Sequence, residues 1–342
     1  MMKAIVKSKP VKGLWMEEID VSEPGFGEVL IKVKKASICG TDKHIFDWDD
    51  WSKKTIPIPL VIGHEFVGSI AKLGERVENF NVGDRVSAEG HIVCYSCSNC
   101  RSGNYHLCPN TQGIGVNRPG AFAEFVCVPA SNVIKIPNGI SDDTATLLDP
   151  LGNAVHAALS YDLIGEDVLV AGAGPIGIMA ALICQMVGAR NVVLTEINPY
   201  RLKLAKEVGV RNVVDVGNNC LSTVMQNFSI TEGFGVSLEM SGSPTAMRTI
   251  VDTSKNGGKI AVLGIASTNL VVPWDTVVFK MLNIKGIYGR EMFNTWQKMM
   301  SLLEGGLDVS GLITHRIPFD EFEIGFNAIE SGSAGKVILE LD

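Results

Sequence analysis

Val168-Leu169-Val170-Ala171-Gly172-Ala173-Gly174-Pro175-Ile176-Gly177 is the stretch of the sequence that decides the fold. The apolar residues at its start predict a buried strand, and the glycines that follow fit the pattern G-x-G-x-x-G. The apolar run Pro175–Val187 comes next. It is shorter than the roughly 20 residues that span a bilayer, so it predicts a buried core helix. A strand, a glycine loop and an apolar helix in this order favour a dinucleotide-binding unit.

Each glycine of the loop has a separate physical task. Gly172 permits a tight turn, Gly174 lets a pyrophosphate approach the backbone, and Gly177 lets the helix pack close to the strand. The N-terminus of the helix then offers free N–H groups to the phosphates. Glu196, about 20 residues further on, would accept hydrogen bonds from the ribose and repel a 2′-phosphate, which favours NAD over NADP. Arg201 keeps NADP open, because it is either a phosphate partner or a solvated helix residue.

The rest of the second half repeats this alternation. Asn198 and Pro199 predict the N-cap and first residue of a helix that ends near Gly209. Further strands are expected at Val192–Thr195, Val213–Val216, Val236–Met240, Ile260–Leu263 and Ile284–Tyr288, and further helices at Leu221–Phe228 and Thr245–Thr253. Short apolar strands alternating with helices predict an α/β fold with a doubly wound parallel sheet, the Rossmann arrangement.

The first half of the chain is rich in short strands. Val29–Val33 follows a turn, Val67–Ala71 is a second candidate, and Gly83-Asp84-Arg85-Val86 is a turn that enters a third. Short strands with frequent glycines predict a small barrel or sandwich. The 342 residues are enough for two domains.

Composition limits the partners and the compartment. The chain is 46% apolar and carries a net charge of −7, which gives no indication of a nucleic-acid partner. The N-terminal residues lack the apolar segment of a secretory signal, and we expect no membrane partner. Cysteines that cluster in a protein of this kind indicate metal rather than disulfides, so the expected location is the reducing cytoplasm.

Four of the eight cysteines, Cys94, Cys97, Cys100 and Cys108, lie within fifteen residues. Such thiolates match a tetrahedral structural zinc site without an open position. The first spacings and Pro109 also resemble a ferredoxin iron–sulfur run, but the last spacer is longer here; a brown protein would favour iron. The isolated residues Cys127, Cys184 and Cys220 are expected to serve packing.

A second metal site is indicated by residues around Cys39 and His64. A catalytic zinc needs about three protein ligands and one open position. Cys39 and His64 would supply a thiolate and an imidazole, and Glu65 or Asp149 would supply a carboxylate. The spacing alone is a weak signal, because a lone histidine is more often a structural residue than a ligand and Cys39 could be a buried apolar residue.

Several motifs in their order resemble the zinc-dependent medium-chain alcohol dehydrogenases. They are Gly63-His64-Glu65-x-x-Gly68, Gly83–Val86, the four cysteines and Gly172–Gly177. The resemblance covers nearly the whole chain. It implies a GroES-like β-barrel catalytic domain over residues 1–150 and 291–342, with the cysteine lobe at about 91–110. It places a Rossmann NAD-binding domain over residues 151–290.

Longer strings are similar to the branch of that family that oxidises threonine. They are Asp47–Ser52, Gly115–Gly120, Asp149–His156 and Gly286–Phe293. This branch implies NAD-dependent oxidation of the C3 hydroxyl of L-threonine to 2-amino-3-oxobutanoate, with zinc as a Lewis acid and hydride passing to NAD. It also implies two zinc ions per chain, one catalytic and one structural, and a homotetramer.

The resemblance also assigns roles to residues of this chain. Cys39, His64 and Glu65 would hold the catalytic zinc, and Thr41 and His44 would form a proton relay. Asp149 would support the relay without firm coordination, since many family members carry Glu or Cys there and Asp is shorter. The NAD site would be lined by Gly172, Gly174, Ile176, Gly177, Glu196, Arg201, Leu263, Gly264, Ile265, Ile287 and Tyr288.

Some alternatives stay open at this point. A polyol dehydrogenase of the sorbitol or butanediol type would share every zinc and NAD motif. A zinc-stabilised binding protein could keep the fold without the chemistry. The sequence does not assign the partners of the substrate carboxylate and ammonium; Arg290 is a candidate for a carboxylate or a pyrophosphate, or else forms a surface salt bridge.

Overall fold

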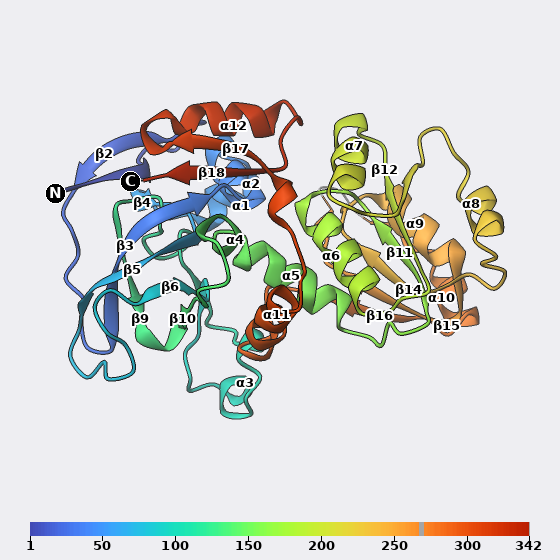
Figure 1. Ribbon diagram of the computed structural model, residues 1–342, viewed down its shortest axis with the longest axis horizontal. Coiled ribbons are helices and arrows are strands. Elements are labelled where there is room, and N and C mark those ends of the chain that lie inside the picture. Colours follow the sequence, from blue (N-terminus) through green and yellow to red (C-terminus); the bar gives the residue numbers. More distant parts are fainter. Residues whose placement is uncertain (267–269, 342) are drawn as a thin grey trace. The chain divides into compact units, whose positions relative to one another are not determined.

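The computed structural model describes residues 1–266 and 270–341 (Figure 1). The chain divides into two compact units, Met1–Asp149 with Ile313–Asp342, and Pro150–Leu312. The sequence predicted that the catalytic domain includes residues 291–342. In the structure, residues 291–312 group with the second unit instead. The helix α11 (Asn294–Glu304) lies in this segment.

The first unit consists mainly of strands joined by short helices. Its strands are β1 (Met2–Lys7), β2 (Trp15–Ile19), β3 (Glu28–Ser37), β4 (Leu60–Val61), β5 (Glu65–Leu73), β6 (Arg85–Ala88), β7 (His91–Ile92), β8 (Gln112–Gly113), β9 (Phe125–Pro129), β10 (Val133–Lys135), β17 (Ile313–Pro318) and β18 (Lys336–Glu340). Its helices are α1 (Gly40–Asp47), α2 (Asp50–Thr55), α3 (Ser98–Arg101), α4 (Asp142–Ala145) and α12 (Phe322–Glu330), with 3₁₀ turns at Tyr105–Leu107, Ala130–Asn132 and Phe319–Glu321. The helix α5 (Leu148–Ala158) begins here and continues into the second unit.

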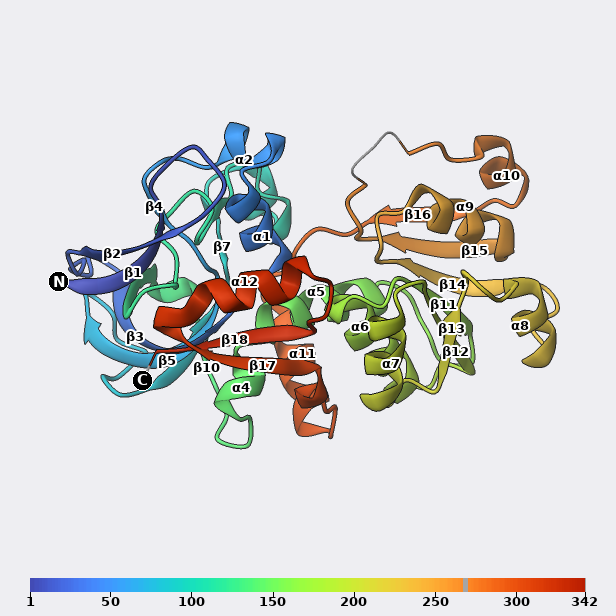
Figure 2. The same cartoon turned by 90° about the horizontal axis from the view of Figure 1, so that it is seen from above.

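Two larger sheets organise the first unit. One has the order β2-β1-β4, and the other has the order β10-β6-β5-β3-β18-β17 with β9 paired to β3. Most neighbours are antiparallel, and β18 brings the end of the chain against β3. The core is formed by apolar side chains from these strands and from α12, which lies beside β17 and β18 (Figure 2). The predicted strands at Val29–Val33 and Val67–Ala71 are confirmed as parts of β3 and β5.

The second unit alternates strands and helices as expected. Its strands are β11 (Asp167–Ala171), β12 (Asn191–Glu196), β13 (Asn212–Asp215), β14 (Phe234–Glu239), β15 (Ser254–Val262) and β16 (Asn283–Gly286). Its helices are α6 (Pro175–Met186), α7 (Pro199–Glu207), α8 (Leu221–Asn227), α9 (Pro244–Thr253), α10 (Trp274–Phe279) and α11, with a 3₁₀ turn at Ser310–Leu312.

The strands of the second unit form a single parallel sheet in the order β13-β12-β11-β14-β15-β16. Figures 1 and 2 show α6 and α7 on one face of it and α9 and α10 on the other. This is the doubly wound order, in which ligands bind at the carboxyl ends of the strands where the order reverses. The predicted α/β fold is confirmed.

Local signals explain where the helices of this unit begin. Asn198 caps α7, because its Oδ1 accepts hydrogen bonds from the backbone N–H groups of Tyr200 at 2.9 Å and Arg201 at 3.2 Å. Ser243 caps α9 in the same way. The apolar run predicted as a core helix is α6, whose residues from Gly177 to Cys184 are all buried. Within the described residues, no helix combines the length and apolar character needed to cross a membrane.

Candidate active site and dinucleotide site

Cys39, His64 and Glu65 come together at one end of the β3–β5 pair. In this antiparallel pair Ser37 stands opposite Glu65. Cys39 follows β3 directly and forms the N-cap of α1, while His64 precedes β5. One donor atom from each of the three residues lies within 4.8 Å of the other two. The structure therefore gathers the three ligands that the resemblance implied.

The two glycines that frame His64 and Glu65 are required by steric contacts. Gly63 has φ +90°, and a Cβ there would lie 2.1 Å from the ring of Phe122. A Cβ at Gly68 would lie 2.1 Å from the carbonyl oxygen of Lys32. Because neither neighbour has room for a methyl group, the glycines of this motif fix the path of the chain through the site.

Glu65 is a buried carboxylate held by two donors. Its Oε2 accepts hydrogen bonds from the hydroxyl of Ser37 and the ammonium of Lys336, while its Oε1 is a buried oxygen without a hydrogen-bond partner among the described residues. Burial opposes the charge of Lys336, but Glu65 and Cys39 raise the pKa of that ammonium. Sequence reasoning missed Ser37 and Lys336, and no local pattern marks either of them.

Asp42 lies close to both Cys39 and His64. It is fully buried and accepts a hydrogen bond from the backbone N–H of Cys39 at 2.9 Å. Its Oδ1 lies 3.8 Å from Nδ1 of His64. Burial raises the pKa of Asp42 to about 6. Sequence reasoning missed Asp42, although its place three residues after Cys39 completes a capping box of α1.

His64 lies in a strongly anionic environment. Burial disfavours its cation, but Asp42, Cys39 and Asp149 together raise the pKa of His64 well above its ordinary value. Asp149 is buried near the start of α5 and stands outside the group of three close donors.

The donor set fits zinc on both chemical and structural grounds. A thiolate, an imidazole and a carboxylate are typical ligands of a catalytic zinc with an open position. Buried polar atoms normally have partners, yet Nδ1 of His64 and Oε1 of Glu65 have no hydrogen-bond partner among the described residues. A cation bound between Cys39, His64 and Glu65 would satisfy this concentration of negative charge.

The two expected relay residues lie on α1. Thr41 is partly buried in the first turn, whereas the side chain of His44 is 63% exposed in the last turn. Nδ1 of His44 lies 2.6 Å from Oδ2 of Asp49. Spacing of three residues puts Thr41 and His44 on the same face of the helix.

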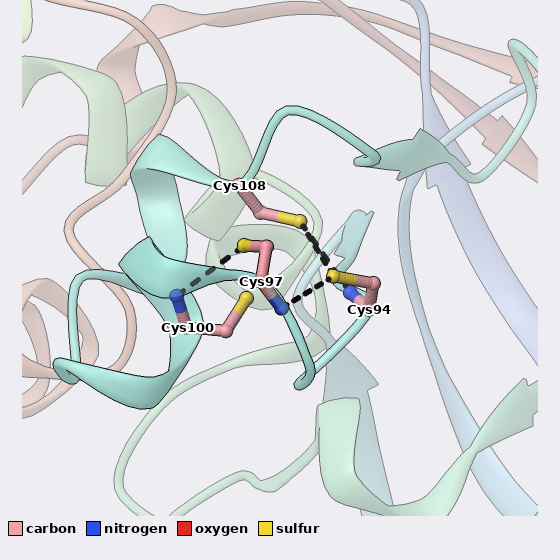
Figure 3. A group of neighbouring side chains, drawn as sticks. All are labelled: Cys94, Cys97, Cys100 and Cys108. Atoms are coloured by element: carbon pink, nitrogen blue, oxygen red, sulfur yellow. Dashed lines mark hydrogen bonds between the residues drawn. The ribbon is translucent and has the colours of Figure 1, made fainter.

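Cys94, Cys97, Cys100 and Cys108 converge as predicted for a closed metal site (Figure 3). Their sulfur atoms all lie within 4.8 Å of one another. Backbone N–H groups of Cys97 and Cys100 point at the sulfurs of Cys94 and Cys97, each at 3.4 Å. Hydrogen bonds from Ser96 and Cys97 lower the pKa of Cys94 to about 5, which favours the thiolate that a metal needs.

The glycine loop has the shape that the sequence predicted. Gly172 has φ +105°, and a Cβ at Gly177 would lie 1.9 Å from the carbonyl oxygen of Gly172, so the helix packs directly on the turn. A Cβ at Gly174 would meet no atom of the described residues within 4 Å. Gly174 is also the N-cap of α6. The loop therefore leaves room for phosphates at the helix N-terminus, which fits a dinucleotide.

Glu196 ends β12 and is tied to this loop. Its Oε2 accepts a hydrogen bond from the backbone N–H of Ala173 at 2.9 Å, and Arg201 lies 3.8 Å from the same oxygen. Glu239 ends β14 and accepts bonds from the backbone N–H groups of Ser241 and Gly242. Sequence reasoning missed Glu239, whose only signal is its place at the end of a buried strand.

The remaining expected NAD residues follow the ends of neighbouring strands. Ile176 lies in the first turn of α6; Leu263, Gly264 and Ile265 follow β15, and Ile287 and Tyr288 follow β16. Parallel strands put these ends at one edge of the sheet. A Cβ at Gly264 would lie 2.2 Å from the backbone nitrogen of Gly242, so the turns after β14 and β15 are in close contact.

Arg290 is 2% exposed, so the interpretation as a surface salt bridge is wrong. Its Nη1 donates a hydrogen bond to Oδ1 of Asn153 at 3.2 Å. A Cβ at Gly152 would lie 2.5 Å from Cδ of Arg290. The arginine side chain therefore passes over Gly152 at a distance that leaves no room for a methyl group. A buried guanidinium needs several hydrogen-bond acceptors, because an unpaired buried charge is costly. Arg290 is therefore held in the interior of the protein and not at its surface.

Two family models match this chain. The alcohol dehydrogenase GroES-like domain matches residues 25–138, and the zinc-binding dehydrogenase model matches residues 175–305. The chain therefore belongs to the zinc-binding alcohol dehydrogenases, a family of oxidoreductase enzymes with a GroES-like domain.

Curated relatives narrow this class to one enzyme. The chain is similar to L-threonine 3-dehydrogenase of Mesorhizobium japonicum, with 60% identity over 340 residues, 99% of both chains. The enzyme of the same name from Rhizobium etli is 59% identical over 340 residues, again 99% of both chains. That from Cronobacter sakazakii is 57% identical over 341 residues, 100% of both chains.

Solved structures show the same fold at lower identity. A protein described as a short chain alcohol dehydrogenase from Escherichia coli, complexed with NADH, has a TM-score of 0.91 and 29% identity and covers 99% of each chain. The 2R,3R-butanediol dehydrogenase of Bacillus subtilis has a TM-score of 0.89 and 27% identity over 100% of each chain. A zinc-binding dehydrogenase from Sinorhizobium meliloti, bound to NADP, has a TM-score of 0.91 and 26% identity, with 100% of this chain and 99% of that chain covered.

Proposed function

We propose that this enzyme oxidises the C3 hydroxyl of L-threonine to 2-amino-3-oxobutanoate with NAD. The observation that carries the proposal is the full-length identity of 57–60% to relatives named L-threonine 3-dehydrogenase. The cluster of Cys39, His64 and Glu65 supports the chemistry, because it can hold the zinc that the family name requires.

Zinc held by Cys39, His64 and Glu65 would supply a Lewis acid for the substrate hydroxyl, and NAD would accept the hydride. Four thiolates at Cys94, Cys97, Cys100 and Cys108 would hold a second, structural zinc.

The residues of α1 would remove the proton. Thr41 lies two positions after Cys39, as the second residue of α1, and its hydroxyl can both accept and donate a hydrogen bond. His44 is exposed enough to pass a proton to solvent. Asp149 would tune the charge at His64, on which it already acts electrostatically, without being a firm ligand.

We expect a preference for NAD over NADP because of Glu196, the last residue of β12. Glu196 is buried and held beside the glycine loop, so its carboxylate would meet the ribose hydroxyls and repel a 2′-phosphate. Arg201 lies close to the same carboxylate and would be neutralised by it rather than left for a phosphate.

The test is NADH absorbance with zinc-replete protein, NAD and L-threonine, with D-threonine, serine, sorbitol and 2,3-butanediol in parallel. We expect the highest kcat/KM on L-threonine. A His44→Gln variant should lower kcat and leave the affinity for NAD unchanged, because a glutamine cannot carry the proton. Equal kcat in that variant would remove the relay from the proposal.

A second candidate is a dehydrogenase of diols or polyols. The observation in its favour is the similarity to the 2R,3R-butanediol dehydrogenase of Bacillus subtilis over 100% of both chains. Its identity of 27% is far below that of the threonine enzymes, so it ranks second. A higher kcat/KM on 2,3-butanediol or sorbitol than on L-threonine would select it.

The homotetramer and the cytoplasmic location stay predictions. Support for assembly comes from large exposed apolar side chains near the sheet edge at β16, where Trp274 is 67%, Phe279 82% and Met281 80% exposed. Such a patch on a soluble enzyme marks an interaction surface. Sedimentation of the zinc-replete protein measures the number of copies directly.

A further inference from the structure

Asp49 connects the short helices α1 and α2, of which α1 begins directly after Cys39. Its Oδ1 accepts a hydrogen bond from the backbone N–H of Ser52 at 2.9 Å, so it caps α2. Its Oδ2 lies 2.6 Å from Nδ1 of His44, in the last turn of α1. The hydroxyl of Ser52 donates to the carbonyl oxygen of His44 at 2.8 Å and completes a closed set of contacts.

These contacts fix the hydrogen on the imidazole. An ionised carboxylate only accepts hydrogen bonds, so a ring nitrogen at this distance must carry the hydrogen. Burial favours the neutral form of Asp49, but hydrogen bonds from Ser52 and His44 outweigh burial and lower the pKa of this carboxyl group. The carboxylate therefore stays charged. In the neutral ring Nδ1 is then the donor and Nε2 is the acceptor.

Asp49 is well placed to keep this arrangement. Trp48 precedes it in the left-handed conformation, with φ 56°, and turns the chain sharply between α1 and α2. The ring of Trp51 stands edge-on to the ring of His44, with centroids 6.3 Å apart. Because the cap fixes one oxygen, the other oxygen is aimed at the imidazole at little further entropic cost.

We propose that Asp49 is a positioning residue that holds His44 in its Nδ1–H tautomer, so that Nε2 accepts the substrate proton. The inference rests on the proposed relay of Thr41 and His44. The proton of the alcohol passes through the Thr41 hydroxyl to Nε2, the imidazolium keeps its Nδ1–H bond to Asp49, and Nε2 then releases the proton to solvent. An aspartate that orients a histidine in this way is a known device of proton transfer.

The decisive variant is Asp49→Asn. Asparagine caps helices as well as aspartate does, so α2 should keep its start. Its oxygen would remain with Ser52 and its NH₂ group would face His44, which forces Nδ1 to accept and moves the hydrogen to Nε2. Asp49→Ser keeps a cap but contacts no imidazole. Asp50→Asn is the matched control, because it removes a carboxylate from the same turn. The side chain of Asp50 is 89% exposed and pairs with Lys53.

The tautomer is read without activity by long-range ¹⁵N–¹H correlation spectra of the zinc-replete protein, with the His44 signals assigned from His44→Gln. We expect Nδ1–H in the wild type and in Asp50→Asn, and Nε2–H in Asp49→Asn. Wild-type protein with Nε2–H, or Asp49→Asn with Nδ1–H, would overturn the proposal.

Kinetics then separates this inference from the proposed function. With the best alcohol of the substrate panel, kcat of Asp49→Asn should fall roughly tenfold to a hundredfold, while KM for NAD and the unfolding midpoint stay unchanged. Asp50→Asn should keep the wild-type kcat. If His44→Gln is slow but Asp49→Asn is as fast as the wild type, the positioning role fails and the relay stands. If both are as fast as the wild type, the relay itself fails.

Discussion

The ammonium of Lys336 donates a hydrogen bond to Oε2 of Glu65, a residue 271 positions earlier in the chain. Both side chains are buried, and Lys336 also donates to the carbonyl oxygen of Ile38 at 2.9 Å. The bond links β18, near the end of the chain, to the start of β5, where Glu65 is the first residue. Oε2 of Glu65 is therefore occupied by contacts within the fold, and Oε1 is the oxygen that has no hydrogen-bond partner among the described residues.

Lys336→Met should strongly destabilise the first unit. It leaves the carboxylate of Glu65 buried without its cation, a change that costs about 3–5 kcal/mol when one partner of a buried pair is removed. Urea unfolding of the metal-free protein, followed by circular dichroism, measures the loss. Adding Glu65→Gln should recover part of it, because the uncompensated charge is then gone.

Lys53→Met is the control for this prediction. Lys53 pairs with Asp50 at the surface, where both side chains are exposed, and such a pair contributes less than about 1 kcal/mol. A loss of the same size in Lys53→Met and Lys336→Met would show that burial of the Glu65 pair has no energetic weight.

Much of the fold was predictable because its signals are local. Gly172, Gly174 and Gly177 stand between an apolar strand and an apolar helix, and the alternation that follows gave the parallel sheet. Strand ends were less accurate: the expected strand Ile284–Tyr288 is β16 (Asn283–Gly286). The end of a strand depends on the length of its neighbour, which a local pattern does not contain.

The site was predictable only in part, for the same physical reason. Cys39, His64 and Glu65 carry ligand chemistry in their side chains, and the structure gathers them. Lys336 and Glu239 have no such signal, because a lysine or glutamate is ordinary at the surface and becomes notable only when buried. Their burial follows from strand pairing over long sequence separations.

Cys100→Ser should remove one metal ion per chain and leave the other. The sulfur of Cys100 is one of four thiol groups within 4.8 Å of one another, and a serine hydroxyl is a much weaker zinc ligand. Mass spectrometric metal analysis of the purified protein should show two zinc ions in the wild type and one in the variant. Cys220→Ser, at an exposed and isolated thiol, should keep both. Two zinc ions in Cys100→Ser would contradict the closed site.

Two glycine substitutions should have different effects. In Gly177→Ala the new Cβ would lie 1.9 Å from the carbonyl oxygen of Gly172, so the helix must move and the protein should lose about 2 kcal/mol or more of stability. In Gly174→Ala the methyl group has no atom within 4 Å in residues 1–266 and 270–341, so stability should hardly change. It would instead occupy the approach of the pyrophosphate and weaken NAD binding at least tenfold. Thermal unfolding and NADH fluorescence titration distinguish the two, and an unchanged NAD affinity in Gly174→Ala would exclude this loop as the phosphate site.

Lys7 should make the stability of the first unit depend on alkaline pH. Its side chain is fully buried, and its Nζ donates to the carbonyl oxygens of Val11 at 2.6 Å and Gly13 at 2.9 Å. Burial lowers the pKa of Lys7 from 10.5 to about 8. Between these two values the unfolded chain keeps a proton that the folded protein has lost, so the contribution of Lys7 to the free energy of unfolding rises with pH.

Lys7→Met removes this titration, and the comparison with the wild type cancels the groups that both proteins share. At neutral pH the variant should be less stable by about 1–3 kcal/mol, because the carbonyl oxygens of Val11 and Gly13 lose their donor. The wild-type advantage should then widen by on the order of 2 kcal/mol as the pH rises through the interval from about 8 to 10.5. Urea unfolding at a series of pH values measures both the stability difference at neutral pH and its change as the pH rises. A gap that stays constant, or narrows, over that interval would mean that the folded protein holds the Lys7 proton as tightly as the unfolded chain does.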